Sequence, residues 1–351
     1  MSDTGNLTLA LGLTLFTFLI TSLLLVPFID LLYKFKLLRR KEAPTKGKIP
    51  LFDKLHDKKA GTPVGGGILM VCVITITYLA MFPFARHMGI FIDSFFDLQT
   101  ELFIIIFTFV SFGLLGFLDD YIKVFGKTTK GTLGLWVGLK RKHKFALQVV
   151  LATITSLFLY KFLGIHIIHI PLVDYVVDLK LLFVPFAALV IIFFTNAFNI
   201  TDGLDGLSSG LLIIFLVAFG AISAGNLDTP LSLFIALSVG SLLAFTYFNI
   251  FPARLHLGDV GALAFGAVIA LIGLLNGSIV SLFVIGGIFV VELLSSAIQI
   301  LGWKYLKRPI FPLAPLHHAF LARGWEEPKI VMRAWLAGIV LAIFGLWLAT
   351  I

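Results

Sequence analysis

The sequence Asn196-Ala-Phe-Asn-Ile-Thr-Asp-Gly-Leu-Asp-Gly-Leu207 lies between two long apolar runs. Asp202 and Asp205 therefore follow one membrane-length segment and precede the next. At a helix start, their spacing would place both carboxylates on one helix face, and Gly203 and Gly206 would let a ligand approach closely. The same residue types are common in turns and helix N-caps, so the rest of the chain has to decide between a site and an ordinary turn.

The composition of the chain indicates an all-α integral membrane protein. Apolar residues make up 59% of the 351 residues and charged residues only 13%. A soluble protein of this length could not bury so many apolar side chains. The apolar runs are continuous and reach the roughly 20 residues of a membrane-spanning helix, unlike the short alternating segments of a β-barrel. Because no repeat or soluble segment is visible, we expect a single domain over residues 1–351.

Apolar continuity predicts about ten transmembrane helices. They cover residues 7–33, 64–84, 102–118, 145–163, 180–198, 207–224, 231–250, 260–276, 279–303 and 330–350. Lysine and arginine crowd the first, third and ninth loops, whereas the alternate loops carry scattered acids such as Asp93, Asp97 and Glu101, which we interpret as solvated. Because basic loops stay in the cytoplasm, both termini are expected outside.

Five carboxylates then fall on one side of the membrane. Asp119 and Asp120 close the third predicted span, Asp202 and Asp205 follow the fifth, and Asp259 opens the eighth. All five are expected at the cytoplasmic ends of apolar helices. Carboxylates at membrane depth are costly and usually mark a site, so we predict an active site on the cytoplasmic face.

Oxygen ligands without cysteine suit Mg²⁺, which typically binds one or two carboxylates together with substrate phosphates. Lys123, Lys130 and Lys144 could hold further phosphate oxygens, although most lysines in such loops only fix the topology. Lys123 is the favoured one, because it lies one helical turn after Asp119. The helix start at Asp259 adds unpaired backbone N–H groups, which favour anions. The sequence therefore predicts a magnesium-assisted site for a phosphate compound.

A proline-rich segment, 309–320, ends on the adjacent residues His317 and His318. Paired histidines on a loop are more often solvated than functional. These two share the predicted cytoplasmic face with the carboxylates, so we predict that they bind substrate. Glu292 and Gln299 lie inside the ninth apolar run without an obvious partner, and we interpret them as interhelical hydrogen-bonding residues.

Taken together, these motifs resemble a known family. Asp119-Asp120, the run Asn199-Ile-Thr-Asp-Gly-Leu-Asp-Gly206, Gly258-Asp-Val-Gly261 and Pro315-Leu-His-His318 are similar, in this order, to the polyprenyl-phosphate N-acetylhexosamine-1-phosphate transferases. Within that superfamily the phospho-N-acetylmuramoyl-pentapeptide transferases are the most similar. The likeness begins at Gly61-Thr-Pro-Val-Gly-Gly66 and runs to the last predicted span.

The resemblance implies a Mg²⁺-dependent transferase of the bacterial inner (plasma) membrane. It would transfer phospho-MurNAc-pentapeptide from UDP-MurNAc-pentapeptide to undecaprenyl phosphate, giving lipid I and UMP for peptidoglycan synthesis. Attack by the lipid phosphate in one step is favoured over an aspartyl-phosphate route, which the sequence leaves open. A homodimer is one option for the oligomeric state, and no nucleic-acid partner is expected.

The resemblance also implies roles for single residues. Asp259 matches the magnesium ligand and catalytic carboxylate, Asp119 and Asp120 match the acid–base pair, and Lys123 and Lys144 match lysines near the phosphates. The remaining matches are Asn199, Asp202, Asn249, His317 and His318 at active-site positions, with Asp202 counted as catalytic, and Asp205 at a uracil-binding one.

Three positions depart from the family pattern. Ala319 replaces a third consecutive histidine, His256 replaces a phenylalanine that stacks on uracil, and Ala262 replaces a common serine. These departures keep open a sister transferase that uses UDP-N-acetylglucosamine. An ion-coupled transporter is the alternative from another class, but it would place its acids near the bilayer midplane and show repeated halves.

Overall fold

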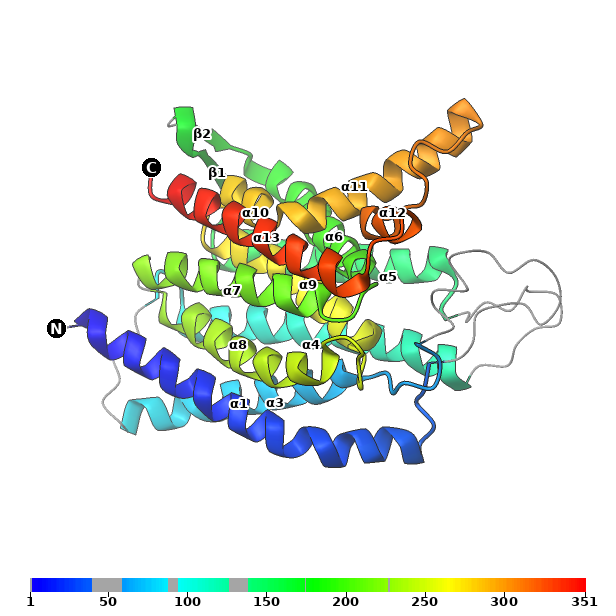
Figure 1. Cartoon of the computed structure of the whole chain (residues 1–351). Helices are drawn as coiled ribbons and strands as arrows, with labels where there is room; N and C mark the ends of the chain where they lie inside the picture. The colour runs from blue at the N-terminus through cyan, green and yellow to red at the C-terminus, as the bar shows by residue number, and fades with distance from the viewer. Residues whose placement is uncertain (1, 40–58, 88–93, 126–137, 174, 227) are drawn as a thin grey trace.

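The computed structural model describes residues 2–39, 59–87, 94–125, 138–173, 175–226 and 228–351, and it is a bundle of helices (Figure 1). The helices are α1 (Ser2–Lys34), α3 (Gly66–His87), α4 (Leu98–Phe125), α5 (Arg141–Phe162), α6 (Phe183–Thr201), α7 (Leu207–Gly225), α8 (Thr229–Asn249), α9 (Gly258–Leu275), α10 (Ile279–Ile285), α11 (Gly287–Leu301), α12 (Leu316–Ala322) and α13 (Glu327–Ala349).

The described residues contain nine helices that are long and apolar enough to cross a membrane, and α3 carries a shorter apolar stretch. Each predicted span corresponds to one helix, except the ninth, and the prediction of an all-α integral membrane protein is confirmed. Both termini lie at one end of the bundle (Figure 1). We call the other end, where α4 ends and α9 begins, the site end. Its assignment to the cytoplasm stays a prediction from the basic loops.

Helix α9 is the centre of the bundle, and every residue after Gly258 in it is buried. Glycines let neighbouring helices reach its backbone. A Cβ atom on Gly116 of α4 would overlap the carbonyl group of Asp259, and one on Gly67 of α3 would overlap the backbone of Gly261. Such close approach of small residues is how helices pack tightly within a membrane. The packing fixes the first turn of α9 against the end of α4.

The ninth predicted span, 279–303, is wrong as a single helix. It divides at Gly286 into α10 and α11, and α11 projects away from the bundle (Figure 1). The adjacent residues Gly286 and Gly287 explain the break, because glycine is a poor helix former and marks kinks. A Cβ atom at Gly286 would also crowd the ring of Phe194. After α11 the chain passes through one π-helical turn, Gly302–Leu306.

The end that carries the termini holds two features absent from the sequence-based prediction. The strands β1 (Ile167–Ile170) and β2 (Tyr175–Asp178) form a short antiparallel hairpin. The interpretation of the acids at this end as solvated and scattered is wrong for Glu101, which is fully buried and accepts a hydrogen bond from the Ser94 hydroxyl at 2.6 Å. Its neighbour Asp228 is also buried, and burial raises the pKa of the Asp228 carboxyl. A tertiary contact therefore encloses acids that hydropathy alone places in water.

Candidate active site

Two carboxylates and two lysines form the centre of the site end. Asp119 comes from α4 and Asp259 from the first turn of α9. Lys123 Nζ lies 2.7 Å from Asp259 Oδ2 and 2.9 Å from Asp119 Oδ2. Lys144 Nζ, from α5, lies 2.6 Å from Asp259 Oδ2 and 3.0 Å from Asp119 Oδ2. The structure thus brings together four predicted residues from three helices, with both cations shared between both carboxylates.

The donor set fits a metal ion that is held in part by its substrate. Within the part of the chain that the structure describes, no group of three or more acidic, histidine or cysteine side chains is arranged to hold a metal. Mg²⁺ usually needs only one or two carboxylates when substrate phosphates complete its shell. Asp259 and Asp119 offer such hard oxygen atoms beside two cations suited to phosphate.

Asp120 has a different environment from Asp119. Its Oδ2 accepts a hydrogen bond from the backbone N–H of Val260 at 3.2 Å, so it ties α4 to the first turn of α9. The adjacent aspartates point to different partners because successive helix residues are about 100° apart around the axis. Asp119 Oδ1 in turn accepts a 2.6 Å bond from the backbone N–H of Leu139.

Asp202 and Asp205 do not lie on one helix face, so that expectation is wrong. Helix α6 ends at Thr201, and α7 begins only at Leu207. The turn between them passes through Gly206 at φ 81°, a left-handed conformation that favours glycine. The Asp202 carboxylate turns back and accepts a 2.5 Å bond from the Ser208 hydroxyl. Burial raises the pKa of Asp202 to about 6, and the negative charge of Asp259 adds to the shift.

Asp205 belongs to a separate ionic cluster with two residues that the sequence analysis did not single out. Lys59 Nζ lies 2.6 Å from Asp205 Oδ1 and 2.5 Å from Glu327 Oε1. The Asp205 backbone N–H also donates to Glu327 Oε1 at 2.6 Å, and Asp205 Oδ2 accepts from the Ala253 N–H at 2.9 Å. Lys59 lies two residues before the Gly61-Thr-Pro-Val-Gly-Gly66 motif noted in the resemblance, and that adjacency is the signal that could have found it.

His256 borders this cluster. Its Nδ1 lies 4.0 Å from Asp205 Oδ1, and its backbone pairs with Pro63 and Gly65 ahead of α3. The Nε2 atom is buried and has no hydrogen-bond partner among the described residues. Burial lowers the pKa of His256 to about 4, and the positive charges of Arg39 and Lys59 add to this against the opposing effect of Asp205. The pKa of the His256 imidazole therefore lies well below the ordinary value of 6.5.

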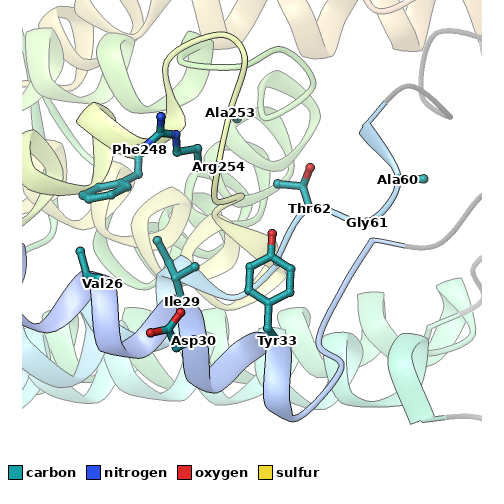
Figure 2. Close-up of a pocket in the computed structure, with 10 residues that line it drawn as sticks. All are labelled: Val26, Ile29, Asp30, Tyr33, Ala60, Gly61, Thr62, Phe248, Ala253 and Arg254. Atoms are coloured by element: carbon teal, nitrogen blue, oxygen red, sulfur yellow. The ribbon is translucent and has the colours of Figure 1, made fainter.

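A cavity of about 590 Å³ opens beside the Asp205 cluster (Figure 2). Asp30 and Tyr33 of α1 line one wall, and Phe248 and Arg254 lie on the other side. Ala253, which donates to Asp205, also lines it. Its volume is within the range of about 300–1,000 Å³ that is typical of small-molecule sites, and its lining mixes apolar and charged groups.

The two predicted histidines are buried at the start of α12 instead of solvated on a loop. His317 Nδ1 lies 3.0 Å from Glu292 Oε2, which also accepts the His317 backbone N–H at 3.3 Å. A carboxylate only accepts hydrogen bonds, so Nδ1 carries the hydrogen toward Glu292 and Nε2 points to the other side of the ring. Nε2 has no hydrogen-bond partner within the described residues, and it lies against Gly203.

The interpretation as interhelical hydrogen-bonding residues is confirmed for Glu292, which links α11 to His317 of α12. It is wrong for Gln299, which bonds the non-helical segment at Ile310 and Phe311. Both residues, together with Ser295, hold the proline-rich segment and α12 against α11. Gln299 Oε1 accepts the backbone N–H groups of Ile310 and Phe311 at 3.0 and 2.9 Å, and Ser295 Oγ accepts that of Leu316 at 3.0 Å. One face of α11 therefore supports the histidines.

The remaining predicted residues divide into three groups. Asn249 is buried and bonded within the protein: its Oδ1 accepts from the Gly206 N–H at 3.1 Å, and its Nδ2 donates to the Leu255 carbonyl at 3.0 Å. Asn199 is half-buried near the end of α6. Lys130 lies outside the described residues. Roles in substrate binding stay predictions for all three.

Comparison with known proteins shows the family of the chain. Residues 102–277 match the glycosyl transferase family 4 model. The phospho-N-acetylmuramoyl-pentapeptide-transferase of Bacillus pumilus is 35% identical over 94% of this chain and 95% of its own length. The enzyme of the same name from Bacillus subtilis is 34% identical over 94% and 95%, and that from Staphylococcus saprophyticus is 36% identical over 84% and 87%. The chain therefore belongs to glycosyl transferase family 4 and to the family of the phospho-N-acetylmuramoyl-pentapeptide-transferases.

Proposed function

We propose that this multi-pass membrane protein transfers phospho-MurNAc-pentapeptide from UDP-MurNAc-pentapeptide to undecaprenyl phosphate, producing lipid I and UMP. The observation that carries the proposal is the pair of lysines shared between Asp119 and Asp259 at one end of a membrane bundle. This arrangement suits two phosphate groups that meet at a membrane surface. The relatives' names supply the identity of the donor sugar and peptide.

The reaction brings two anions together. An oxygen of the lipid phosphate attacks the phosphorus atom that carries the sugar, and the bond to the bridging oxygen of UMP breaks. The protein itself does little covalent chemistry in this reaction, so its main contributions are to position the substrates and to stabilise charge. Lys123 and Lys144 can each leave a carboxylate to bind phosphate oxygens, because their ammonium groups end within 3.0 Å of both aspartates.

Asp259 is the proposed magnesium ligand, with Asp119 as its neighbour. When bound, Mg²⁺ would neutralise charge on the diphosphate and on the leaving UMP. Asp120 fixes the first turn of α9 through Val260, and Asp202 is close enough for the charge of Asp259 to act on it. His317 Nε2 lies against Gly203, in the turn that also carries Asp202, and we propose that it binds substrate there.

The donor's uridine is proposed to lie at the Asp205 and His256 side, where the 590 Å³ cavity opens. The site end is proposed to face the cytoplasm of a bacterial cell, since the basic loops favour that side. A net charge of +8 would assist the approach of an anionic nucleotide.

The experiment is UMP release from purified protein in detergent with undecaprenyl phosphate. UDP-MurNAc-pentapeptide is compared with UDP-N-acetylglucosamine, each with Mg²⁺ and with EDTA. We expect release with the first donor only, and only with Mg²⁺. Release with UDP-N-acetylglucosamine alone would assign the protein to the sister activity, and full activity in EDTA would remove the metal from the proposal.

A further inference from the structure

Two cations lie over one indole ring where α12 passes into α13 (Figure 1). The backbone N–H of Trp325 donates to the Phe320 carbonyl of α12 at 3.1 Å, and the two rings pack with their centroids 4.8 Å apart. The Cζ of Arg333 lies 4.5 Å from the centroid of the Trp325 ring, and the Nζ of Lys329 lies 5.4 Å from it. We call Phe320, Trp325, Lys329 and Arg333 the indole cluster.

The protein does not neutralise the two cations of the indole cluster. Both are exposed, and no carboxylate of the described residues lies within ion-pair distance of Lys329 or Arg333. The acid in the first turn of the same helix, Glu327, is paired with Lys59 instead. Stacking uses the flat face of a guanidinium and leaves the N–H groups at its edge free, and these can bind two phosphate oxygens at once. The cluster therefore offers two positive charges to an anion, one of them with a fixed plane.

The face of α13 that carries both cations continues as an apolar surface. Side chains three and four residues apart share one helix face, and four that follow the cations at this spacing are 63–64% exposed: Met332, Leu336, Val340 and Ile343. At 1.5 Å per residue this row is about 16 Å long, which is about half of the roughly 30 Å hydrocarbon thickness of a bilayer. Because α13 is long and apolar enough to span the membrane, the row faces the acyl chains of one leaflet and the cluster lies at the level of the headgroups.

We propose that the indole cluster binds the phosphate of an anionic glycerophospholipid, such as phosphatidylglycerol, and that the acyl chains of this lipid lie along the exposed face of α13. Charge complementarity favours the anionic headgroup, and the apolar row that continues from the cations favours a lipid over a soluble phosphate. Basic sites beside membrane-spanning helices bind lipid headgroups in this way. The proposal goes beyond the proposed function, because this lipid is neither donor nor acceptor.

The first test measures lipid binding to the purified protein in detergent by native mass spectrometry. Phosphatidylglycerol should bind on the order of tenfold more tightly than phosphatidylcholine with the same acyl chains, because each basic residue at a headgroup contributes about fivefold. The double substitution Lys329→Gln and Arg333→Gln should remove this preference. Its matched control, Lys307→Gln with Arg308→Gln, removes the same two residue types from exposed positions outside the cluster and should change the affinity by less than about twofold. Equal affinities of the wild type and the first double variant for phosphatidylglycerol would overturn the proposal.

The substitution Trp325→Leu separates a built site from surface charge alone. Both cations remain, but the ring that fixes the plane of Arg333 is lost. The affinity for phosphatidylglycerol should fall about threefold, as expected for the loss of cation–π contacts at an exposed position. If Trp325→Leu binds phosphatidylglycerol as tightly as the wild type does, the indole cluster is not the site.

Competition identifies the kind of phosphate. Excess unlabelled phosphatidylglycerol should displace labelled phosphatidylglycerol, whereas glycerol 3-phosphate should not, because it lacks the acyl chains. Displacement by glycerol 3-phosphate would assign the cluster to soluble phosphates. Stronger displacement by undecaprenyl phosphate than by phosphatidylglycerol would assign it to the acceptor of the proposed reaction, and either result would overturn the proposal.

A photo-crosslinking experiment keeps the inference testable if the substituted proteins do not fold. p-Benzoylphenylalanine replaces Leu336 on α13, or as a control Leu189 on α6, which is exposed to the same extent. In nanodiscs in which phosphatidylglycerol is the minor lipid, radiolabelled phosphatidylglycerol should crosslink to the Leu336 variant about fivefold more than to the control. Radiolabelled phosphatidylcholine should crosslink to both variants equally. Equal crosslinking of phosphatidylglycerol at the two positions would overturn the proposal.

Discussion

The contact between Glu292 and His317 leads to a quantitative expectation. Glu292 is 5% exposed and His317 1%, so the two hydrogen bonds between them are shielded from water. Hydrogen bonds to charged groups contribute about 1.5–3 kcal/mol each. The substitution Glu292→Gln keeps the side-chain shape but removes the carboxylate, and its amide can donate to Nδ1 and so select the other imidazole tautomer. Nε2 would then carry a hydrogen toward the site.

If catalysis needs the Nε2 lone pair as a hydrogen-bond acceptor, the tautomer change in Glu292→Gln removes that hydrogen bond. The loss of one such bond should lower kcat/KM by roughly ten- to a hundredfold. UMP release under steady-state conditions measures this change. The matched control is Ser295→Ala, which removes the acceptor for the Leu316 N–H in the same segment but does not touch the imidazole. That neutral bond contributes about 1 kcal/mol to stability, so the activity of the control should stay within about threefold of the wild type.

Two outcomes would contradict this reasoning. A Glu292→Gln variant with normal activity would mean that the His317 tautomer is irrelevant. Equal losses in Glu292→Gln and Ser295→Ala would mean that Glu292 only holds the segment in place. A lowered kcat with an unchanged donor KM would support action on the reacting groups, whereas a raised KM alone would indicate a role in binding.

Three further expectations follow from the site. Asp259→Asn should reduce turnover at least about a hundredfold, because the substitution removes the negative charge between two lysines. The variant should still fold and elute as the wild type does. Activity near normal would exclude Asp259 as the metal ligand. Gly203→Ala should lower activity about tenfold or more, because the new methyl group overlaps His317 Nε2, whereas Gly225→Ala, which meets no atom within 4 Å, should be neutral. His256 has its pKa lowered to about 4, so it is neutral above pH 6.5 in the folded protein, and its contribution to stability is present there. That contribution is lost as pH falls from about 6.5 to about 4. The wild type should therefore lose thermal stability over this window more steeply than His256→Phe. Parallel curves of thermal stability against pH for the two proteins would refute the lowered pKa of His256.

The positions of the helices were accessible to sequence reasoning because hydropathy and length are local properties. The run predicted at 207–224 is a helix at Leu207–Gly225, and the run at 260–276 is Gly258–Leu275. The break at Gly286 was missed because the apolar run continues across it and the adjacent glycines were not interpreted as a break.

The grouping of Asp119, Asp259 and the two lysines was predictable from sidedness, since helix ends on one side of a membrane must meet in one plane. The ionic contacts of Asp205 with Lys59 and Glu327 were not, because the three residues come from distant parts of the chain and only the fold brings them together. The same holds for the partner of Glu292. In the sequence Glu292 is an isolated polar residue in an apolar run, and only the fold brings His317 into contact with it.

The burial of α9 has a consequence for how the protein responds to its bilayer. Hydrophobic mismatch acts on helices that touch lipid, which tilt or shift as the hydrocarbon layer thickens or thins. Helix α1 is open to such forces, with only 22% of its apolar window buried, whereas 94% of the α9 window is enclosed by protein. The depth of Asp259 is therefore set by neighbouring helices and not by acyl-chain length. The same site geometry should persist in membranes of different thickness, with the outer helices absorbing the difference.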